Sequence, residues 1–320
     1  MRPCTLVAHA RHALAMCMRK NSQLIALNHT REFAMAPLTR LSPRARGGYL
    51  AEVMPIQCAC GSYADPDYAG LLYPKGLAPE LRLSAYAMWF DHLELNASYY
   101  AVPKAASVQK CIEATPQNFQ FDVRLHRVIS QSPDKSAQEG RLLSYFLEGV
   151  QPLIQAKKLG AFLLVLSPNF TPERHQLEEL DALVAKLAPH PLAIELRHRS
   201  WVEGKTRTTT LGWFRERKVI WVTVDMPPIA GSDLMPAVDV VTNPRLAYLR
   251  LHGRNSGWLD AKTAADKHNY AYTEDNLREI TARVRKLAAR AENVRVVANN
   301  HARDFAPRTA LALKEQLGLF

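Results

Sequence analysis

The sequence has few cysteines, no long apolar run and no glycine-rich phosphate loop, and each absence argues against a class of protein. Five cysteines among 320 residues, an odd number without regular spacing, argue against a secreted disulfide scaffold and for a reducing compartment such as the cytoplasm. No stretch approaches about 18 consecutive apolar residues, which excludes a membrane-spanning helix. Without a glycine-rich loop after the first expected strand, a doubly wound nucleotide-binding sheet becomes the weaker alternative fold.

Acidic residues are almost missing from the N-terminal part of the chain. Residues 1–51 hold eight Lys or Arg against one acid, Glu32, so they supply +7 of the net charge of +11. The remaining 269 residues hold 33 basic and 29 acidic side chains and are nearly neutral. A nearly neutral body has no obvious surface for following a phosphate backbone, so a nucleic-acid partner is only weakly supported.

Residues 1–54 lack helical periodicity, and three interpretations stay open. The segment could be an organelle transit peptide, a consequence of a true start near Met35 or Met54, or a disordered extension. No secretory signal is present, because the apolar run Leu24–Leu27 is too short. The string Cys4, His9, His12 and Cys17 matches no common zinc module, and we interpret it as accidental. We expect a separate leader over 1–54 and one domain over 55–320.

From Ile56 onward, short apolar runs alternate with longer amphipathic stretches about every thirty residues. The expected strands are Ile56–Cys60, His92–Asn96, Phe119–His126, Ala161–Leu166, Leu192–Arg197, Val219–Val224, Leu246–His252 and Val294–Asn299. The expected helices are Leu81–Phe90, Ala105–Ala114, Gln138–Lys157, Glu173–Leu187, Thr208–Arg217, Thr273–Ala291 and Pro307–Leu317. A proline-rich loop replaces the helix between the sixth and seventh strands. This pattern predicts an α/β fold, a single (β/α)8 TIM-like barrel.

Charged residues alternate with apolar ones in four of these strands. Glu94 and Asn96 share one face of their strand, and Arg124 lies on the polar face of the next. In the same way Glu195 pairs with Arg197, and Arg250 with His252. Leucine, isoleucine and phenylalanine belong against the outer helices, so we expect the charged set to face the barrel axis near the carboxyl ends of the strands, where barrel active sites are built.

The inward set predicts a positively charged site for a small anionic ligand. Arg197, Arg250 and Arg124 suit phosphate or carboxylate, while Glu195 or Glu94 could act as acid or base and His252 could orient the substrate. A set of mutually satisfied ion pairs that only fixes strand register stays an alternative. Further substrate-binding candidates at the strand ends are Asn96, Asn300, His198, Arg254, Trp201 and Tyr63.

Other site chemistries have weaker signals. A divalent metal is possible, because Glu94, Glu195, Asp225, His198, His252 and His301 are ligand types, but no local metal spacing exists among them and no cofactor is firmly predicted. Cys58 and Cys60 share a strand face and are better explained as core residues than as a redox pair. Ser62 and Ser200 lack a nucleophile-elbow context.

Several long motifs resemble the YecE-like family, also called domain of unknown function 72. They occur in the family's order and cover about Ile56 to Gly318. The stretches are Tyr63-x2-Pro66-x-Tyr68-x-Gly70-x2-Tyr73-Pro74, Leu93–Tyr100 with Pro103, Ile194–Trp201, Leu249–Asn255 and Asn299–His301. The resemblance implies a TIM-like barrel and a site at these motifs. It implies no reaction, because the family's activity is not established.

The sequence departs from the family pattern on two walls of the expected site. Arg124 replaces a typical lysine, Ser130-Gln131 a Thr-His pair, and Val165–Pro168 a Gln-x-Pro-Pro run.

The leading hypothesis for the function is an enzyme, such as a hydrolase, isomerase or lyase, acting on a small or nucleotide-type anion. The alternatives are a non-catalytic binding protein for nucleic acid or an anionic metabolite, and a barrel without a pocket. The oligomeric state is not indicated.

Overall fold

The computed structural model describes residues 56–320, so the expected leader over residues 1–54 lies outside the described part of the chain. Eight parallel strands form one sheet in the order β1-β8-β7-β6-β5-β4-β3-β2. They are β1 Ile56–Cys60, β2 His92–Leu95, β3 Gln120–Arg124, β4 Leu159–Val165, β5 Leu192–Glu195, β6 Ile220–Asp225, β7 Ala247–Leu251 and β8 Val294–Ala298. Each strand expected from the sequence is present, and the predicted barrel is confirmed.

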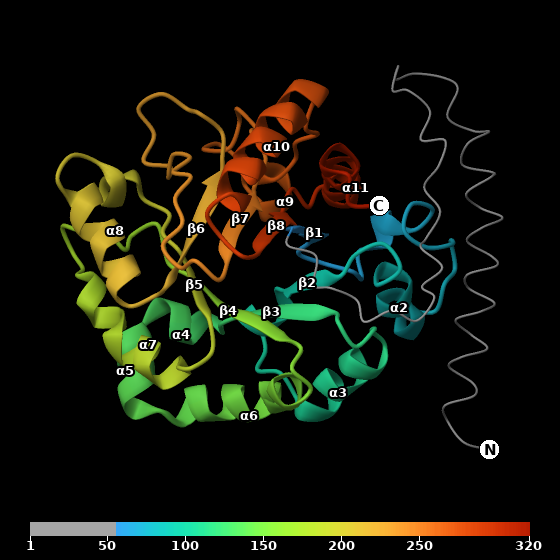
Figure 1. The fold of residues 1–320 in the computed structure, drawn as a ribbon, viewed down its shortest axis with the longest axis horizontal. Helices are drawn as coiled ribbons and strands as arrows, with labels where there is room; N and C mark the ends of the chain where they lie inside the picture. Colours follow the sequence, from blue (N-terminus) through green and yellow to red (C-terminus); the bar gives the residue numbers. More distant parts are fainter. Residues whose placement is uncertain (1–55) are drawn as a thin grey trace.

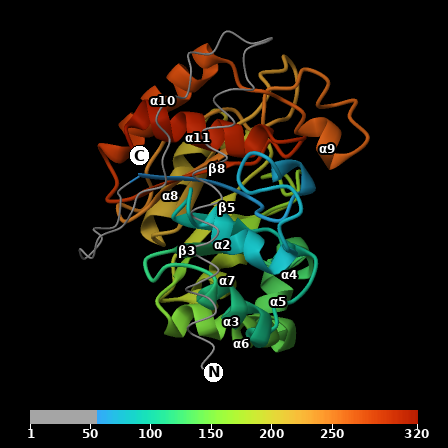
Figure 2. The same ribbon diagram turned by 90° about the vertical axis from the view of Figure 1, so that its right-hand side faces the viewer.

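The helices surround the strands as an outer ring (Figure 1). They are α2 Arg82–Tyr86, α3 Ala105–Glu113, α4 Arg127–Gln131, α5 Pro133–Glu139, α6 Arg141–Gln155, α7 Asp181–Leu187, α8 Thr206–Glu216, α9 Ala264–Lys267, α10 Glu274–Ala288 and α11 Phe305–Leu317. Short 3-10 turns occupy Pro66–Tyr68, Pro79–Leu81, Ala97–Tyr99, Leu177–Leu180 and Arg199–Val202. The short helices α4 and α9 follow β3 and β7 and lie at the same end of the barrel (Figure 2). Among the described residues, no helix combines the length and apolar character needed to cross a bilayer.

The barrel closes through side chains at one seam, because β1 and β2 lie next to each other without pairing as strands. The Tyr86 hydroxyl accepts a hydrogen bond from the Cys60 amide (3.0 Å) and donates one to the His92 carbonyl (3.0 Å). Near the carboxyl end of the seam, Asn96 Nδ2 donates to the Gly61 carbonyl (3.1 Å). The Tyr86 and Asn96 side chains therefore replace part of the backbone hydrogen bonding that is missing between β1 and β2.

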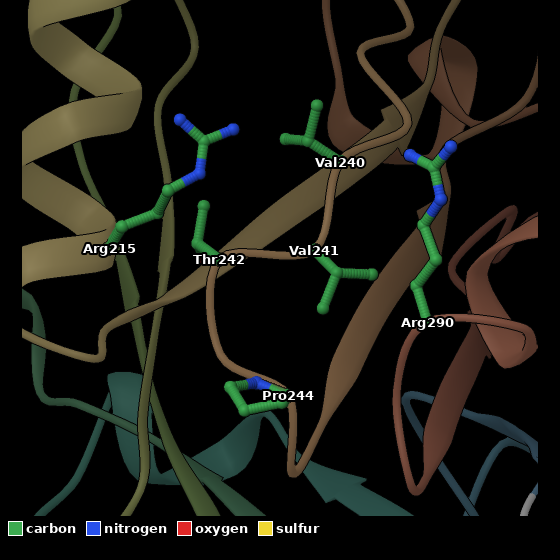
Figure 3. A pocket seen from close by; sticks show the side chains of 6 residues that line it. All are labelled: Arg215, Val240, Val241, Thr242, Pro244 and Arg290. Carbon is green, nitrogen blue, oxygen red and sulfur yellow. The ribbon is translucent and has the colours of Figure 1, made fainter.

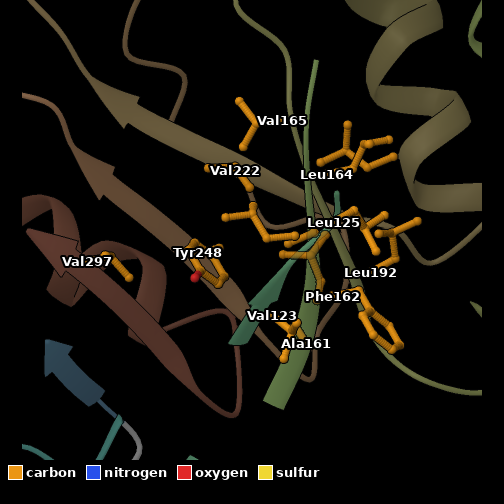
Figure 4. Packing of buried hydrophobic residues seen from close by; sticks show 14 of the residues in the cluster. Val123, Leu125, Ala161, Phe162, Leu164, Val165, Leu192, Val222, Tyr248 and Val297 are labelled. Carbon is orange, nitrogen blue, oxygen red and sulfur yellow. The ribbon is translucent and has the colours of Figure 1, made fainter. Parts of the chain in front are cut away.

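Apolar side chains fill the space between strands and helices and also part of the barrel interior, where Val222, Tyr248 and Val297 share the face of Arg250 (Figure 4). The strand register sets which residues turn inward. Arg250 lies beside Val224 of β6 and Val297 of β8, and Val297 lies beside Ala59 of β1. Partner residues of neighbouring parallel strands share a face, so these small side chains leave room for the Arg250 guanidinium on the barrel axis.

Two expected helices differ from those observed. The stretch Gln138–Lys157 is divided between α5 and α6, because Gly140 adopts φ 68°, a left-handed conformation that ends the first helix. The expected start at Glu173 is wrong: regular structure begins only at Leu177, where Gln176 and Glu179 form a capping box. The start expected at Thr273 is confirmed, since its side chain caps α10 by accepting from the Asn276 amide. As expected, no helix joins β6 to β7.

Candidate functional site

Seven of the side chains predicted for the site come together at the carboxyl ends of β2, β3, β5 and β7. We call this group the charged cluster; its members are Glu94, Asn96, Arg124, Glu195, Arg197, Arg250 and His252. All of them lie on the inward face that the alternation of apolar and charged residues predicted. The cluster joins strands that are far apart in the sequence, since Glu94 and Arg250 are 156 positions apart.

Arg250 is the centre of the charged cluster and is completely buried. Its Nε and Nη2 donate to the two carboxylate oxygens of Glu94, at 3.0 and 2.7 Å, in a two-pronged ion pair. Its Nη1 donates to Glu195 Oε2. Burial alone would lower the pKa of Arg250, but Glu195 and Glu94 outweigh it and raise that pKa. Arg250 is therefore permanently charged and already neutralised by protein.

The two carboxylates have little capacity left for hydrogen bonds. Besides Arg250, Glu94 accepts from the Tyr248 hydroxyl (2.9 Å) and Asn96 Nδ2 (2.9 Å). Glu195 accepts from Arg197 Nε (2.9 Å) and His252 Nε2 (3.3 Å). Burial acts to raise both carboxyl pKa values, but Arg250 and the neighbouring donors together outweigh it and hold both pKa values below their usual range. Both groups are anions that position their donors.

Arg124 and Arg197 are less completely matched than Arg250. Arg124 donates to Asn96 Oδ1 (3.3 Å), its guanidinium carbon lies 4.0 Å from the centre of the Tyr99 ring, and its Nε is buried without a hydrogen-bond partner among residues 56–320. Burial, followed by repulsion from Arg250 and Arg197, lowers the pKa of Arg124 to about 10. The Arg197 side chain is 32% exposed and uses only Nε for Glu195. Three guanidinium groups thus face two carboxylates, which leaves one positive charge in excess.

Neutral imidazoles adjoin the charged cluster. Asn299 joins two of them: its Nδ2 donates to His252 Nδ1 (3.0 Å), and its Oδ1 accepts from His301 Nε2. His268 Nδ1 donates to the His252 carbonyl (2.9 Å). Burial is the main reason that the pKa of His252 is lowered, that of His301 falls to about 4 and that of His268 to about 2. All three rings are therefore uncharged at neutral pH.

Gly61 lets the walls of the site approach one another. A methyl group at this position would lie 2.5 Å from Asn96 Nδ2, 3.0 Å from Asn299 Oδ1 and 3.0 Å from His301 Cε1. Real side chains do not tolerate a 2.5 Å contact, so glycine is required for Asn96 and His301 to be neighbours across this point. Gly61 follows β1 at the unpaired seam of the barrel.

Five predicted substrate-binding residues lie outside the charged cluster. Asn300 points away from the axis, donating to the Tyr270 carbonyl (2.9 Å) and Thr309 Oγ1 (3.1 Å), because Asn299 takes the inward position. The Trp201 indole is buried and donates to the Phe170 carbonyl (2.6 Å). Arg254 pairs with Asp225 (2.7 Å) and Glu279 (2.8 Å) outside the barrel wall.

The other two have structural partners. His198 begins the turn at Arg199–Val202 by accepting from the Ser200 amide. Tyr63 packs against the hydrophobic core, and its backbone carbonyl accepts from the Tyr73 hydroxyl (3.3 Å).

Sequence reasoning also missed two neighbours of the charged cluster. Tyr248 precedes Arg250 by two positions and shares its face, a signal that was available, whereas the loop residue His268 has no periodic signal at all.

The weaker site chemistries receive no support from the described residues. Across residues 56–320, no group of three or more His, Cys, Asp or Glu is arranged to hold a metal ion. Asp225, one suggested ligand, is engaged by Arg254, Arg283 and Tyr272. Cys58 and Cys60 are buried core residues, as interpreted, and burial raises the pKa of both thiols.

Two hollows lie away from the charged cluster. One, of about 370 Å³, is at the amino-terminal end of the barrel, where Arg215 and Arg290 flank the segment Val240–Pro244 (Figure 3). The other, of about 350 Å³, lies under the loop between β6 and β7, beside Arg254 and Arg283. The arginines of the second hollow are already paired with acids. The charged side chains at the first hollow, Arg215 and Arg290, are exposed to solvent.

Comparisons with known proteins agree with this architecture. The family described as "Protein of unknown function DUF72" matches residues 57–319. The UPF0759 protein YunF of Bacillus subtilis (strain 168) is 27% identical over 240 residues, which cover 72% of this chain and 84% of that protein. The UPF0759 protein YecE of Escherichia coli (strain K12) is 29% identical over 156 residues, covering 47% of this chain and 54% of that protein.

Solved structures of similar proteins have the same fold. A DUF72 family protein from Enterococcus faecalis V583, solved at 3.10 Å, superposes with a TM-score of 0.73 and 30% identity, over 83% of this chain and 96% of that one. One from Thermotoga maritima MSB8, solved at 2.20 Å, gives a TM-score of 0.72 and 28% identity, over 83% of this chain and 100% of that one.

Proposed function

The chain belongs to the DUF72 family, and on that premise we propose that it is an enzyme that binds the phosphate or carboxylate group of a small or nucleotide-type substrate at the carboxyl end of the barrel. The family description names no function. Arg124 and Arg197 are the anion ligands in this account, and Arg250 is not, because Glu94 and Glu195 already neutralise it.

The unmatched positive charge at Arg124 is the observation that carries the proposal. A buried guanidinium normally has its donors satisfied, and a donor left without a partner costs about 1–3 kcal/mol. Arg124 has one such donor, and two further guanidinium groups repel it. An anion between Arg124 and Arg197 would satisfy the donor and balance the charge, and guanidinium groups match phosphate and carboxylate geometry.

The surroundings of Arg124 favour a ligand that carries a ring as well as an anion. The Tyr99 ring lies against the Arg124 guanidinium. The Tyr100 ring packs edge to face against the Tyr99 ring, with 5.1 Å between the ring centres. Tyr100 is 72% exposed. An exposed aromatic ring beside an anion site offers a stacking surface for a base or a sugar, which supports the nucleotide-type substrate.

Calorimetric titration of the full chain with inorganic phosphate, a sugar phosphate and a nucleotide tests the proposal. Arg124→Met and Arg197→Met should each weaken phosphate binding about 10- to 100-fold, because a charged hydrogen bond contributes about 1.5–3 kcal/mol. Arg215→Met, at the opposite end of the barrel, is the matched control and should bind as the wild type does. No binding by the wild type, or equal binding by Arg124→Met, would overturn the proposal.

A short oligonucleotide in the same titration distinguishes the non-catalytic alternative. Binding of a nucleic acid weakens steeply with salt, because each phosphate contact releases counterions. An oligonucleotide bound more tightly than a mononucleotide, with a steep salt dependence, would favour a nucleic-acid-binding protein over an enzyme for small anions. The enzyme proposal expects the reverse order of affinities.

A further inference from the structure

The enzyme proposed above needs a group that exchanges protons, and the carboxylates are poorly placed for that task. Glu94 accepts four hydrogen bonds and Glu195 three, all from side chains that the barrel holds in place. A carboxylate whose lone pairs are occupied by fixed donors has little capacity to receive a substrate proton. The assignment of Glu195 or Glu94 as acid or base therefore loses support from this geometry.

His252 is also fully engaged. Its Nδ1 accepts from Asn299 and its Nε2 donates to Glu195, so both ring nitrogens are occupied inside the protein. His301 differs, since only Nε2 has a partner, the Asn299 oxygen. Because this Nε2 carries the proton, Nδ1 holds the free lone pair, and among residues 56–320 it has no hydrogen-bond partner.

The position of His301 places the nitrogen-bearing edge of its ring beside residues of the charged cluster. Its Cε1 lies across Gly61 from the Asn96 amide, and Asn96 in turn holds Arg124. Cε1 is bonded to both ring nitrogens, so the ring edge that carries Nδ1 and Nε2 borders Gly61. The chain Glu195, His252, Asn299 and His301 fixes the orientation and the tautomer of the imidazole.

We propose that His301, oriented by Asn299, is the general base of this site and takes a proton from a hydroxyl group or water next to the anion held by Arg124. The O–H bond breaks, its electron pair stays on oxygen, and the proton forms a bond to Nδ1. As the deprotonated oxygen forms a bond to the phosphorus of a bound phosphoester, the bond from phosphorus to the ester oxygen breaks, its electron pair goes to that oxygen, and the imidazolium returns the proton there. Asn299 is a positioning residue in this scheme, and the inference rests on the proposed function.

Charged and titratable groups surround His301 from several elements. Arg250, Glu94 and Arg124 come from the strands, His252 directly follows β7, and the centre of the His268 ring lies 5.8 Å from that of His301. Burial, followed by Arg250 and Arg124, lowers the pKa of His301 to about 4 against the opposing effect of Glu94, so the ring is a neutral base at pH 7. A phosphate bound at Arg124 would oppose that field and stabilise the imidazolium.

Imidazole NMR of the full chain, with and without inorganic phosphate, tests the inference. The His301 signal is assigned by its loss in His301→Gln, or in His301→Asn if that variant does not fold. We expect the Nε2–H tautomer in the free protein and a rise of about one pH unit in the His301 pKa at saturating phosphate. His190, which precedes β5 at the opposite end of the barrel, is the internal control and should not move.

The outcomes separate this inference from the proposed function. Phosphate that binds through Arg124 and raises the His301 pKa in the wild type, but not in Arg124→Met or Arg197→Met, supports both. Phosphate that binds through Arg124 while the His301 pKa stays unchanged overturns the role of His301 alone. No phosphate binding by the wild type overturns the proposed function, and the general base falls with it.

Discussion

Arg250 shows at the scale of one residue how a charge can be kept inside a barrel. An ion costs several kcal/mol to bury unless it is paired, and Arg250 is completely buried. Three of its nitrogens donate to Glu94 and Glu195, while Val297 and Ala59 give it space. The pair of acids therefore serves mainly to hold Arg250, and Arg250 in turn holds the carboxylates that orient Arg197 and His252.

We predict that Arg250→Met destabilises the protein by about 3–5 kcal/mol, because it leaves two buried carboxylates short of a counter-ion. Urea unfolding monitored by tryptophan fluorescence measures the change. Arg215→Met, an exposed arginine at the other end of the barrel, should change the free energy of unfolding by less than about 0.5 kcal/mol. A loss below about 1 kcal/mol in Arg250→Met would show that the ion pairs matter little.

Alternation along a strand predicted the charged cluster well, including Asn96, Arg197 and His252, which lie one or two positions beyond their strands. Glu94, Glu195 and Arg250 lie within strands, where side chains strictly alternate between the two faces. Asn300 and Trp201 follow their strands, where local turns set the direction of the side chain. The motif Asn299–His301 places both asparagines at the expected site and the substrate-binding role is predicted for Asn300, whereas Asn299 is the one that turns inward.

The seam between β1 and β2 is the weak point at the scale of secondary-structure elements. Every other neighbouring pair of strands is hydrogen-bonded, whereas this pair depends on the Tyr86 hydroxyl and the Asn96 amide. An unpaired strand edge inside a barrel would otherwise leave backbone groups without partners. Tyr86 lies on α2, so this short helix contributes to closing the barrel.

We predict that Tyr86→Phe costs about 1–3 kcal/mol, because the Cys60 amide and the His92 carbonyl both lose their partner. Tyr68→Phe is a close control: Tyr68 is equally buried, but its hydroxyl has no hydrogen-bond partner among the described residues. Its removal should be neutral or slightly stabilising. Chemical denaturation of both variants makes the comparison, and equal stabilities would contradict this account of the seam.

The positions where helices begin and end are the feature of the fold that the sequence predicts least well. Amphipathic periodicity continues from Gln138 through Lys157, so one helix was expected where Gly140 separates two. The Thr171-Pro172-Glu173 sequence has the composition of a helix start, yet regular structure begins at Leu177. The cap at Thr273 was predicted correctly, because there the periodic stretch and the capping residues agree.

At the scale of the whole molecule, five histidines with lowered pKa values set the response to acid. Burial is the main cause at all five: His92, His126, His252, His268 and His301. The unfolded chain takes up protons on these groups near pH 6.5, whereas the folded protein resists doing so. Their stabilising contribution is therefore complete above about pH 6.5 and is lost progressively below it, down to about pH 4 for His301.

We predict that the free energy of unfolding falls between pH 6.5 and 5, by up to about 1.4 kcal/mol per pH unit for each of these histidines. The carboxylates Glu94, Glu195 and Asp122, whose pKa values are also lowered, lose their contribution only at lower pH. Urea unfolding at several pH values measures the slope. His301→Gln should reduce the slope of the free energy of unfolding against pH by the contribution of one histidine. A free energy of unfolding that does not change between pH 6.5 and 5 would contradict the prediction.

The central claim, an anion site between Arg124 and Arg197, is tested most directly by a crystal structure of the protein grown with selenate. Selenate has the shape and charge of the phosphate-like group proposed here, and the anomalous scattering of selenium locates it. The account predicts a peak within hydrogen-bond distance of Arg124 Nε and the free nitrogens of Arg197. Selenate bound only at exposed arginines such as Arg215 and Arg290, with the charged cluster unchanged, would contradict it.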